Sequence, residues 1–339
     1  MTTPVLAEAR GTRVLVTGAT GYVAGWLIKR LLESGAIVHA AVRDPSNAGK
    51  NGHLQAMADA SPGSIVFFKA DLMDAGSHDE AMQGCKIVFH TASPFLLAAN
   101  IHDPQRQVVD PALKGTTDIL EAANRTPSVE RIVLTSSAAA MSGGPADIER
   151  APGGILDESC WNTISSLEIG PYLYSKTVAE RAAWAIAGAQ DRWRLVVINP
   201  TLVLGPGTAD FQTSASFDYV RMMGNGTYKD GVPPWHVGMV DVRDVAEAHY
   251  LAGFADQAEG RHLVSAETHS LGDVVEMLKD AYRDGWPFPQ DTVLPDAAPR
   301  WNSDNSKSKI ALGLEYHPVK DAAIAMFRQL IDTGVLKPA

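Results

Sequence analysis

The sequence lacks the features of several protein classes. Its 339 residues include 29 Lys and Arg against 39 Asp and Glu, a formal net charge of −10, so no surplus of cations is present to neutralise nucleic-acid phosphates. No apolar run reaches the roughly 18 residues of a membrane span, and the leader Met1–Gly11 has no apolar core. The cysteines, Cys85 and Cys160, are too few for a disulfide framework. We expect a cytoplasmic protein that binds a small molecule and neither nucleic acid nor membrane.

Strand-like and helical segments alternate through the first part of the chain. Residues 13–17 form a short apolar block, and residues 22–34 have apolar side chains at helical spacing and end at Gly35. Further apolar blocks follow at 36–42, 65–68, 87–89, 132–135 and 195–198. These blocks are continuous rather than alternating, as in strands that helices cover on both faces. The pattern predicts an α/β fold with a Rossmann-type doubly wound parallel sheet.

The rhythm of the sequence changes after Pro200. Glycines and prolines interrupt a segment rich in Phe, Tyr and Met. We expect a dinucleotide-binding domain over residues 1–204 and a smaller α/β substrate lobe over most of 205–339. The segment of about 237–265 reads as strand, helix and strand, and we expect it to return to the first domain.

A glycine-rich stretch lies between the first strand and the first helix. Residues 17–25 read TGATGYVAG. Gly18 permits a tight turn, Gly21 lets the backbone approach a pyrophosphate, and the small Ala24 lets the helix pack closely on the strand. In this position the stretch indicates dinucleotide binding, although a tight turn without a ligand is the alternative.

The end of the second strand bears on the choice of dinucleotide. An NAD site usually has an acid there that reaches the ribose hydroxyls. Here the strand ends at Arg43, followed by Asp44. The Arg43 guanidinium suits the 2'-phosphate of NADP, and Lys50 can add a second cation. NADP is therefore expected, with a solvated Arg43 beside a ribose-binding Asp44 as the alternative.

Three residues form a candidate catalytic set. Tyr172 and Lys176 lie one turn apart on a helix that Pro171 begins, so both side chains share one face. A neighbouring Lys stabilises a phenolate and lowers the pKa of the Tyr, which makes it a usable general acid or base. Ser137 follows the fifth strand at the carboxyl edge of the sheet, where its hydroxyl can bind a reacting carbonyl oxygen.

Together these motifs resemble the dihydroflavonol reductase and cinnamoyl-CoA reductase branch of the extended short-chain dehydrogenases/reductases, from about Arg13 to Leu330. The resemblance rests on residues 17–23, 43, 71–72, 90–94, 135–137, 172–176, 199–200 and 241–246. It implies hydride transfer from NADPH to a carbonyl carbon, with Tyr172 protonating the oxygen. Lys176 would bind the nicotinamide ribose and tune Tyr172, Ser137 would orient the carbonyl, and Tyr174 would be a bystander.

The same resemblance implies a set of cofactor contacts. Asp71 and Leu72 would lie at the adenine, residues 91–93 along the cofactor, and residues 200–203 beside the nicotinamide. The full set of expected cofactor-binding residues is Gly18, Thr20, Gly21, Tyr22, Val23, Arg43, Lys50, Asp71, Leu72, Thr91, Ala92, Ser93, Thr135, Tyr172, Lys176, Pro200, Leu202 and Val203.

The expected substrate is an apolar or aromatic aldehyde or ketone. Residues 211–235 are rich in aromatic side chains and Met but contain only two cations, Arg221 and Lys229. By analogy with the family, Phe95 would form part of the pocket wall, and Ser137 and Tyr172 would contact the carbonyl. Two alternatives stay open: an NAD-dependent sugar-nucleotide epimerase or dehydratase, and a non-catalytic redox sensor. No metal-binding motif is present, and the oligomeric state stays undetermined.

Overall fold

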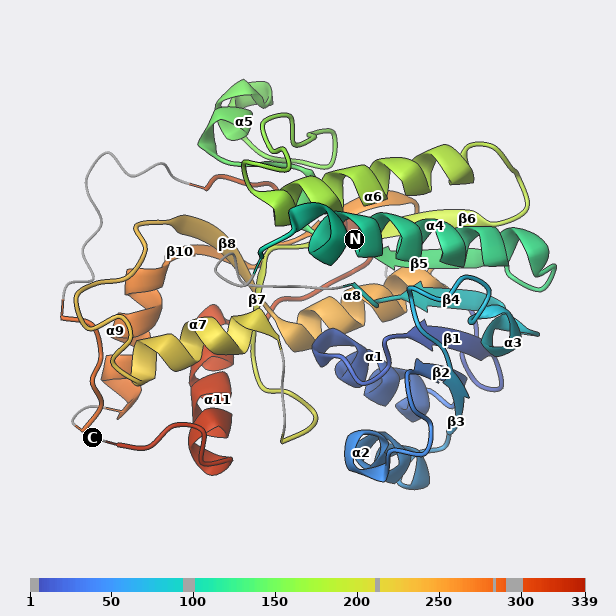
Figure 1. Ribbon diagram of the computed structural model, residues 1–339, viewed down its shortest axis with the longest axis horizontal. Coiled ribbons are helices and arrows are strands. Elements are labelled where there is room, and N and C mark those ends of the chain that lie inside the picture. Colours follow the sequence, from blue (N-terminus) through green and yellow to red (C-terminus); the bar gives the residue numbers. More distant parts are fainter. Residues whose placement is uncertain (1–5, 94–100, 211–213, 283–284, 291–300, 339) are drawn as a thin grey trace.

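A parallel seven-stranded sheet forms the centre of the molecule (Figure 1). The computed structural model describes residues 6–93, 101–210, 214–282, 285–290 and 301–338. The strands of the central sheet lie in the order β3-β2-β1-β4-β5-β6-β9. Their bounds are β1 Arg13–Thr17, β2 Ile37–Val42, β3 Ser64–Lys69, β4 Ile87–His90, β5 Arg131–Thr135, β6 Arg194–Pro200 and β9 Gly260–Val264.

Helices cover both faces of this sheet. Across the described residues the α-helices are α1 Tyr22–Glu33, α2 Ala48–Asp59, α3 Asp79–Met82, α4 Asp110–Arg125, α5 Pro145–Arg150, α6 Pro171–Ala187, α7 Ala215–Gly224, α8 Val242–Phe254, α9 Leu271–Tyr282, α10 Ser306–Ala311 and α11 Val319–Asp332. Those on the two faces of the large sheet are α1, α2 and α8 on one side and α3, α4 and α6 on the other. The alternating side chains of β1 explain the two layers. Val14 and Val16 join one core with α1, α2 and α8, whereas Leu15 joins the other core with α3, α4 and α6. The predicted doubly wound sheet is therefore confirmed.

The first helix ends where its sequence predicts. Gly35 has a φ of 81°, and its amide donates to the Leu32 carbonyl while the Ala36 amide donates to Leu31. This is the hydrogen-bond pattern of a glycine that closes a helix in the left-handed conformation. The closure turns the chain directly from α1 into β2.

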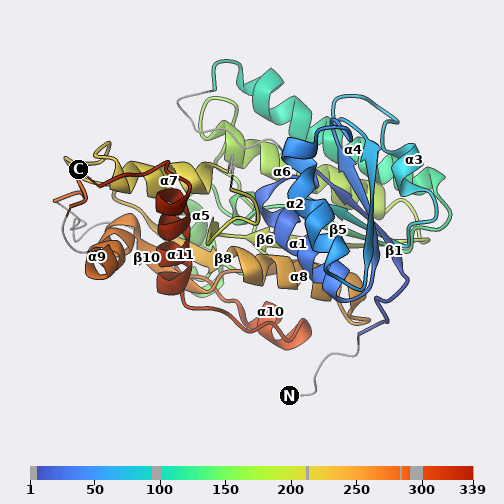
Figure 2. The same ribbon diagram turned by 90° about the horizontal axis from the view of Figure 1, so that it is seen from below.

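A second, smaller lobe packs at one end of the large sheet. It contains a three-stranded sheet in the order β10-β8-β7, with bounds β7 Leu202–Leu204, β8 His236–Asp241 and β10 Glu267–Ser270. Helices α7, α9 and α11 surround this sheet, and Figure 2 shows them gathered away from α1 and α2. Their core contains the fully buried Phe327, which contacts the rings of Tyr282, Trp286 and Phe288.

The returning segment 237–265 is divided between the two lobes. Strand β9 pairs with β6 as the last strand of the large sheet, and α8 packs in the core beneath α1. Strand β8 instead pairs with β7 and β10 in the small sheet. The division of the chain into residues 1–204 and 205–339 remains a proposal.

Strand order places the ligand-binding edge. Strand β1 lies between β2 and β4, and all three strands are parallel. Strands β2 and β3 are added on one side of β1 and β4 to β6 on the other, so the order of addition switches sides between β1 and β4. Ligands of doubly wound sheets bind at this switch point. No helix within the described ranges combines the length and apolar character needed to cross a membrane.

Candidate active site

The predicted phosphate cradle lies where β1 ends and α1 begins. Gly18 has a φ of +61°, and a Cβ there would lie 2.9 Å from the Cα of Ala92. The Thr91 hydroxyl donates to the Thr17 carbonyl at 2.6 Å, and the Ala92 amide donates to the Thr17 hydroxyl at 3.2 Å. The ends of β1 and β4 are therefore tied together, and only glycine fits both the backbone and the contact at Gly18.

The beginning of α1 fits an anionic ligand. The helix is capped by Gly21 without a side-chain hydrogen bond, and its first turn contains no acidic residue. Thr20 and Gly21 are exposed, whereas Ala24 is buried against the sheet. Backbone amides at the positive end of the helix can therefore receive the phosphates of a dinucleotide.

Two side chains of α1 hold the loop that follows β7. Tyr22 Oη donates to the Gly205 carbonyl at 2.6 Å, and Trp26 Nε1 donates to the Pro206 carbonyl at 2.7 Å. Sequence reasoning did not anticipate these contacts, because Gly205 and Pro206 are distant in the chain. The Tyr22 hydroxyl is thus engaged, and Val23 packs half-buried against the core. Contacts of either residue with a cofactor would come through the backbone.

The end of β2 presents cations to solvent. Arg43 and Lys50 are both exposed. Asp44 accepts hydrogen bonds from the Ser46 amide and hydroxyl, which lower the pKa of its carboxyl, and Asn51 donates to the carbonyl of Asp44. The Asp44 carboxylate therefore stabilises the turn that contains it. Both hydrogen bonds from Ser46 end on Oδ1 of Asp44, whereas the Arg43 side chain is exposed to solvent.

The predicted adenine-binding residues follow β3. Asp71 is exposed, and its carboxylate accepts from the Met73 amide at 2.8 Å. Leu72 packs on Gly115 of α4, where a Cβ would lie 3.1 Å from Leu72 Cδ2. Gly115 is a residue that the sequence analysis missed, because a glycine inside a helix does not reveal which side chain approaches it.

Ser137, Tyr172 and Lys176 converge at the carboxyl edge of the large sheet. The Ser137 side chain forms a hydrogen bond with the Tyr172 phenol. Lys176 Nζ lies 5.9 Å from the centroid of the Tyr172 ring and donates to Ser93 Oγ at 2.9 Å. Helix α6 has Pro171 at its beginning, as expected. The helix therefore brings the phenol and the ammonium to the end of β5.

Burial controls the protonation of this set. It raises the pKa of Tyr172 to about 12, while the Ser137 hydrogen bond acts in the opposite direction. Burial also lowers the pKa of Lys176 to about 8, and the charge of Glu180 acts against this shift. The sequence predicts a lowered pKa for Tyr172, whereas its pKa is raised, because desolvation of the phenol is the largest contribution. At neutral pH the phenol holds its proton and the ammonium is charged.

Other predicted cofactor contacts are held by neighbouring elements. Thr135 Oγ1 lies 2.6 Å from His249 Nε2, and His249 Nδ1 lies 2.7 Å from the Val245 carbonyl. Because His249 Nδ1 donates to that carbonyl, the Thr135 hydroxyl donates to Nε2 and is already engaged. Pro200 ends β6 and is buried. Leu202 and Val203, half-buried in β7, begin the small sheet.

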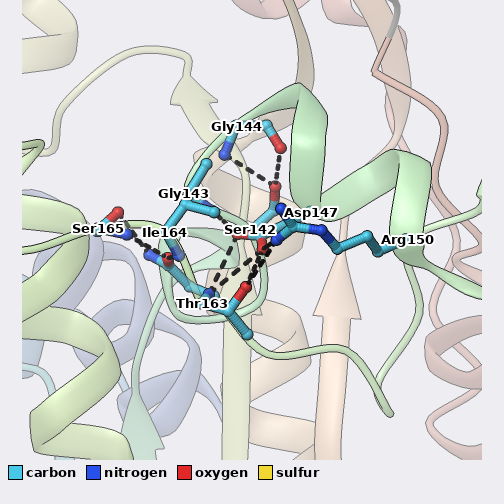
Figure 3. Close-up of polar contacts among 9 residues, drawn as sticks. Ser142, Gly143, Gly144, Asp147, Arg150, Thr163, Ile164 and Ser165 are labelled. Atoms are coloured by element: carbon cyan, nitrogen blue, oxygen red, sulfur yellow. Dashed lines mark hydrogen bonds and ion pairs between the residues drawn. The ribbon is translucent and has the colours of Figure 1, made fainter.

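A hydrogen-bonded cluster around Asp147 of α5 lies between the segment after Ser137 and the segment before α6 (Figure 3). The buried Asp147 carboxylate accepts from the Gly143 amide at 2.8 Å and from the Thr163 hydroxyl at 2.6 Å. Ser142 Oγ accepts from the Gly144 amide at 3.1 Å. These contacts join the segment after Ser137 to the segment before α6.

Sequence reasoning also missed Glu180, on α6 one turn after Lys176. The side chain of Glu180 is fully buried, and its carboxylate accepts from Ser136 Oγ at 2.5 Å and from Asn199 Nδ2 at 2.8 Å. Its spacing from Lys176 is a signal that could have found it, because residues four apart share a helix face.

Buried histidines near the sheet edge are uncharged at neutral pH. Burial lowers the pKa of His90 to about 3 and that of His249 to about 4, so both are neutral at pH 7. Within the described part of the chain, no three or more His, Cys, Asp and Glu side chains are grouped to hold a metal ion. Phe95, expected in the pocket wall, lies outside the described residues.

Comparisons with known proteins point in one direction. The model of the NAD dependent epimerase/dehydratase family matches residues 14–264. The chain is 38% identical to the cinnamoyl-CoA reductase CAD2 of Medicago truncatula, over 91% of this chain and 93% of that protein. It is 35% identical to the bifunctional dihydroflavonol 4-reductase/flavanone 4-reductase of Pyrus communis, over 79% and 76% respectively. The structure of Gre2 in complex with NADPH from Candida albicans superposes with a TM-score of 0.81 at 28% identity, covering 95% of this chain and 99% of that one.

Proposed function

We propose that this chain, which belongs to the NAD dependent epimerase/dehydratase family, reduces apolar or aromatic aldehydes and ketones to alcohols with NADPH. Within that family it is an extended short-chain dehydrogenase/reductase of the cinnamoyl-CoA and dihydroflavonol reductase type, as its motifs predict, and it is an NADP-dependent oxidoreductase. The specific chemistry assigned below to Ser137, Tyr172 and Lys176, and the class of substrate, are our proposals.

The cofactor assignment is supported by the shape and charge of the switch point. The positive φ of Gly18 and the uncapped start of α1 offer backbone amides to a pyrophosphate. The exposed Arg43 and Lys50 offer cations to a 2'-phosphate. Leu72 offers an apolar surface to the adenine. When bound, the reduced nicotinamide supplies the hydride that the carbonyl carbon receives.

The residues of the chain then have separate tasks. The Ser137 hydroxyl hydrogen-bonds the carbonyl oxygen and orients it toward Tyr172. Tyr172 donates its phenolic proton to that oxygen as negative charge develops there, because an alkoxide is a stronger base than a phenolate. The phenolate that remains is stabilised by the Lys176 ammonium and regains its proton from solvent. The hydrogen bond between Ser137 and the Tyr172 phenol is the observation that carries this proposal.

The substrate class rests on the lobe that follows β7. Phe217 and Met223 belong to the core of that lobe, whereas Tyr219 and Tyr228 are half-buried and retain accessible ring surface. Of the two cations in this segment, Arg221 is paired with Asp218 at 2.9 Å. These features favour an apolar carbonyl compound over a second nucleoside diphosphate.

The experiment is NADPH oxidation by the purified protein with a panel of aldehydes, aryl ketones and flavanonol-type compounds. The proposal predicts that NADPH disappears in step with formation of an alcohol, and that Tyr172→Phe lowers this activity by about 10²-fold or more. Interconversion of sugar nucleotides without net use of NADPH would favour an epimerase. NADPH binding without turnover of any carbonyl compound would favour a redox sensor.

A further inference from the structure

A buried carboxylate lies directly behind the proposed catalytic set. Glu180 is on α6, one turn beyond Lys176 and two turns beyond Tyr172, and its side chain is 0% exposed. Besides its two hydrogen bonds described above, it forms an ion pair with Arg261 of β9 at 2.6 Å, and its Oε1 accepts from Trp184 Nε1 at 3.2 Å. An ionised carboxylate is costly to bury unless it is paired and hydrogen-bonded in this way.

The contacts of Glu180 fix the backbone on both sides of Ser137. Ser136, which donates to Glu180, directly precedes Ser137 in the chain. Asn199 Nδ2 donates both to Glu180 and to the Ser137 carbonyl, the latter at 3.1 Å. The end of β5 is therefore attached to the helix that carries Tyr172. A change in this attachment alters the distance between the Ser137 hydroxyl and the phenol.

The charge of Glu180 also acts on Lys176. Both side chains line one small cavity of about 10 Å³, together with Ser93 and His90 of the β4 end. Among the described residues, the titratable and charged groups around Lys176 are Tyr172 and Glu180 on α6 and the neutral His90 on β4, and Glu180 is in turn paired with Arg261. Burial favours the uncharged amine, and the carboxylate counters it.

We propose that Glu180 is a positioning residue of the reductase site, which holds Ser137 against Tyr172 and gives the Lys176 ammonium a buried negative charge. This inference rests on the proposed function, because Ser137, Tyr172 and Lys176 matter only as a reaction set. It adds a residue that touches neither the proposed substrate nor the proposed cofactor.

The decisive variant is Glu180→Gln, which keeps the shape of the side chain and removes its charge. The pKa of Lys176, about 8 with Glu180 present, should fall by about one unit, the lower end of what a neighbouring charge contributes. Because the charged form of Lys176 is the active one, activity is lost above its pKa. The alkaline limb of kcat/KM should therefore move to lower pH by about one unit. The Kd for NADPH, measured by fluorescence, should rise at alkaline pH, and the pH at which this rise begins should be lower in Glu180→Gln by the same amount.

Two matched variants separate charge from structure. Ser136→Ala removes one hydrogen bond and keeps the carboxylate, so kcat should fall while the alkaline limb stays in place. Glu247→Gln makes the same chemical change in the Arg30–Glu247 ion pair, 2.7 Å long and on the opposite face of the sheet. This variant should lower the free energy of unfolding and leave the alkaline limbs of kcat/KM and of NADPH binding in place. If Glu180→Gln does not fold, Glu180→Gln with Arg261→Met avoids the unpaired guanidinium. Its alkaline limb should move in the same direction but by less, because loss of the Arg261 cation acts on the pKa of Lys176 in the opposite sense.

The outcomes distinguish this inference from the proposed function. If the wild type reduces carbonyl compounds but the alkaline limb of kcat/KM does not move in Glu180→Gln, the role of Glu180 is overturned and the proposed reductase activity stands. A shift of the NADPH-binding limb in a protein that reduces no carbonyl compound would support the charge effect on Lys176 and refute the reductase. Equal shifts in Glu180→Gln and Glu247→Gln would overturn the inference as well.

Discussion

Gly18 offers a prediction whose size follows from the geometry of the cradle. Its φ of +61° places it in the left-handed region, and an added Cβ would lie 2.9 Å from both Cα and Cβ of Ala92. The left-handed conformation costs an alanine about 1–2 kcal/mol, and the smaller entropy of the unfolded chain offsets about 0.4–1 kcal/mol of this. The collision with Ala92 adds about 1–3 kcal/mol, the usual cost of overpacking. Gly18→Ala should therefore lower the free energy of unfolding by about 1–5 kcal/mol.

Gly11 provides the matched control for Gly18. It has a φ of +72°, but nothing lies within 4 Å of an added Cβ, so Gly11→Ala should lose only about 1 kcal/mol. Urea denaturation gives both free energies, and fluorescence titration gives the Kd for NADPH. Gly18→Ala should also weaken NADPH binding, whereas Gly11→Ala should not. Equal losses of stability in the two variants would refute the reasoning, because they would show that the contact with Ala92 contributes nothing.

Three further predictions concern the chemistry of the site. Tyr172→Phe should lower kcat by about 10²–10⁴-fold, the usual contribution of a general acid, with the Kd for NADPH nearly unchanged; undiminished turnover would exclude Tyr172 as proton donor. Arg43→Ala should weaken NADPH binding by roughly tenfold or more, since a hydrogen bond to a charged group contributes about 1.5–3 kcal/mol. NADH binding should weaken much less, and equal weakening of both in parallel titrations would rule out contact with the 2'-phosphate. In the wild type, kcat/KM for reduction should fall about tenfold per pH unit above the Lys176 pKa of about 8. A pH profile that stays flat to about pH 10 would contradict a role for the charged ammonium.

Local pattern was sufficient to predict the large sheet. Residues that are neighbours in the sequence determine the continuous apolar blocks of β1, β4 and β5 and the end of α1 at Gly35. The structure confirms these elements. The glycine-rich turn and the helical spacing of Tyr172 and Lys176 are equally local. Elements of this kind depend on residues within one or two turns of each other, so a single sequence contains the information.

Contacts between distant segments could not be predicted in the same way. Strand β8 reads as apolar wherever it pairs, and only the folded chain shows that it joins β7 and β10 rather than the large sheet. Gly25, within the glycine-rich stretch, lies against Thr208: an added Cβ would be 2.1 Å from Thr208 Oγ1, so the Thr208 side chain would have to move. Nothing near Gly25 in the sequence indicates Thr208. The polar partners of Glu180 come from β5, β6 and β9, so its burial also depended on the tertiary structure.

The central claim is that this site transfers a hydride from NADPH to a carbonyl carbon while Tyr172 supplies the proton. The most direct test uses NADPH deuterated at the transferring position of the nicotinamide, with the carbonyl panel and mass spectrometry of the products. The account predicts an alcohol that carries one deuterium on the former carbonyl carbon in the wild type, and formation of this product slowed by about 10²-fold or more in Tyr172→Phe. Product alcohol without deuterium, or labelled alcohol formed equally well by Tyr172→Phe, would contradict it.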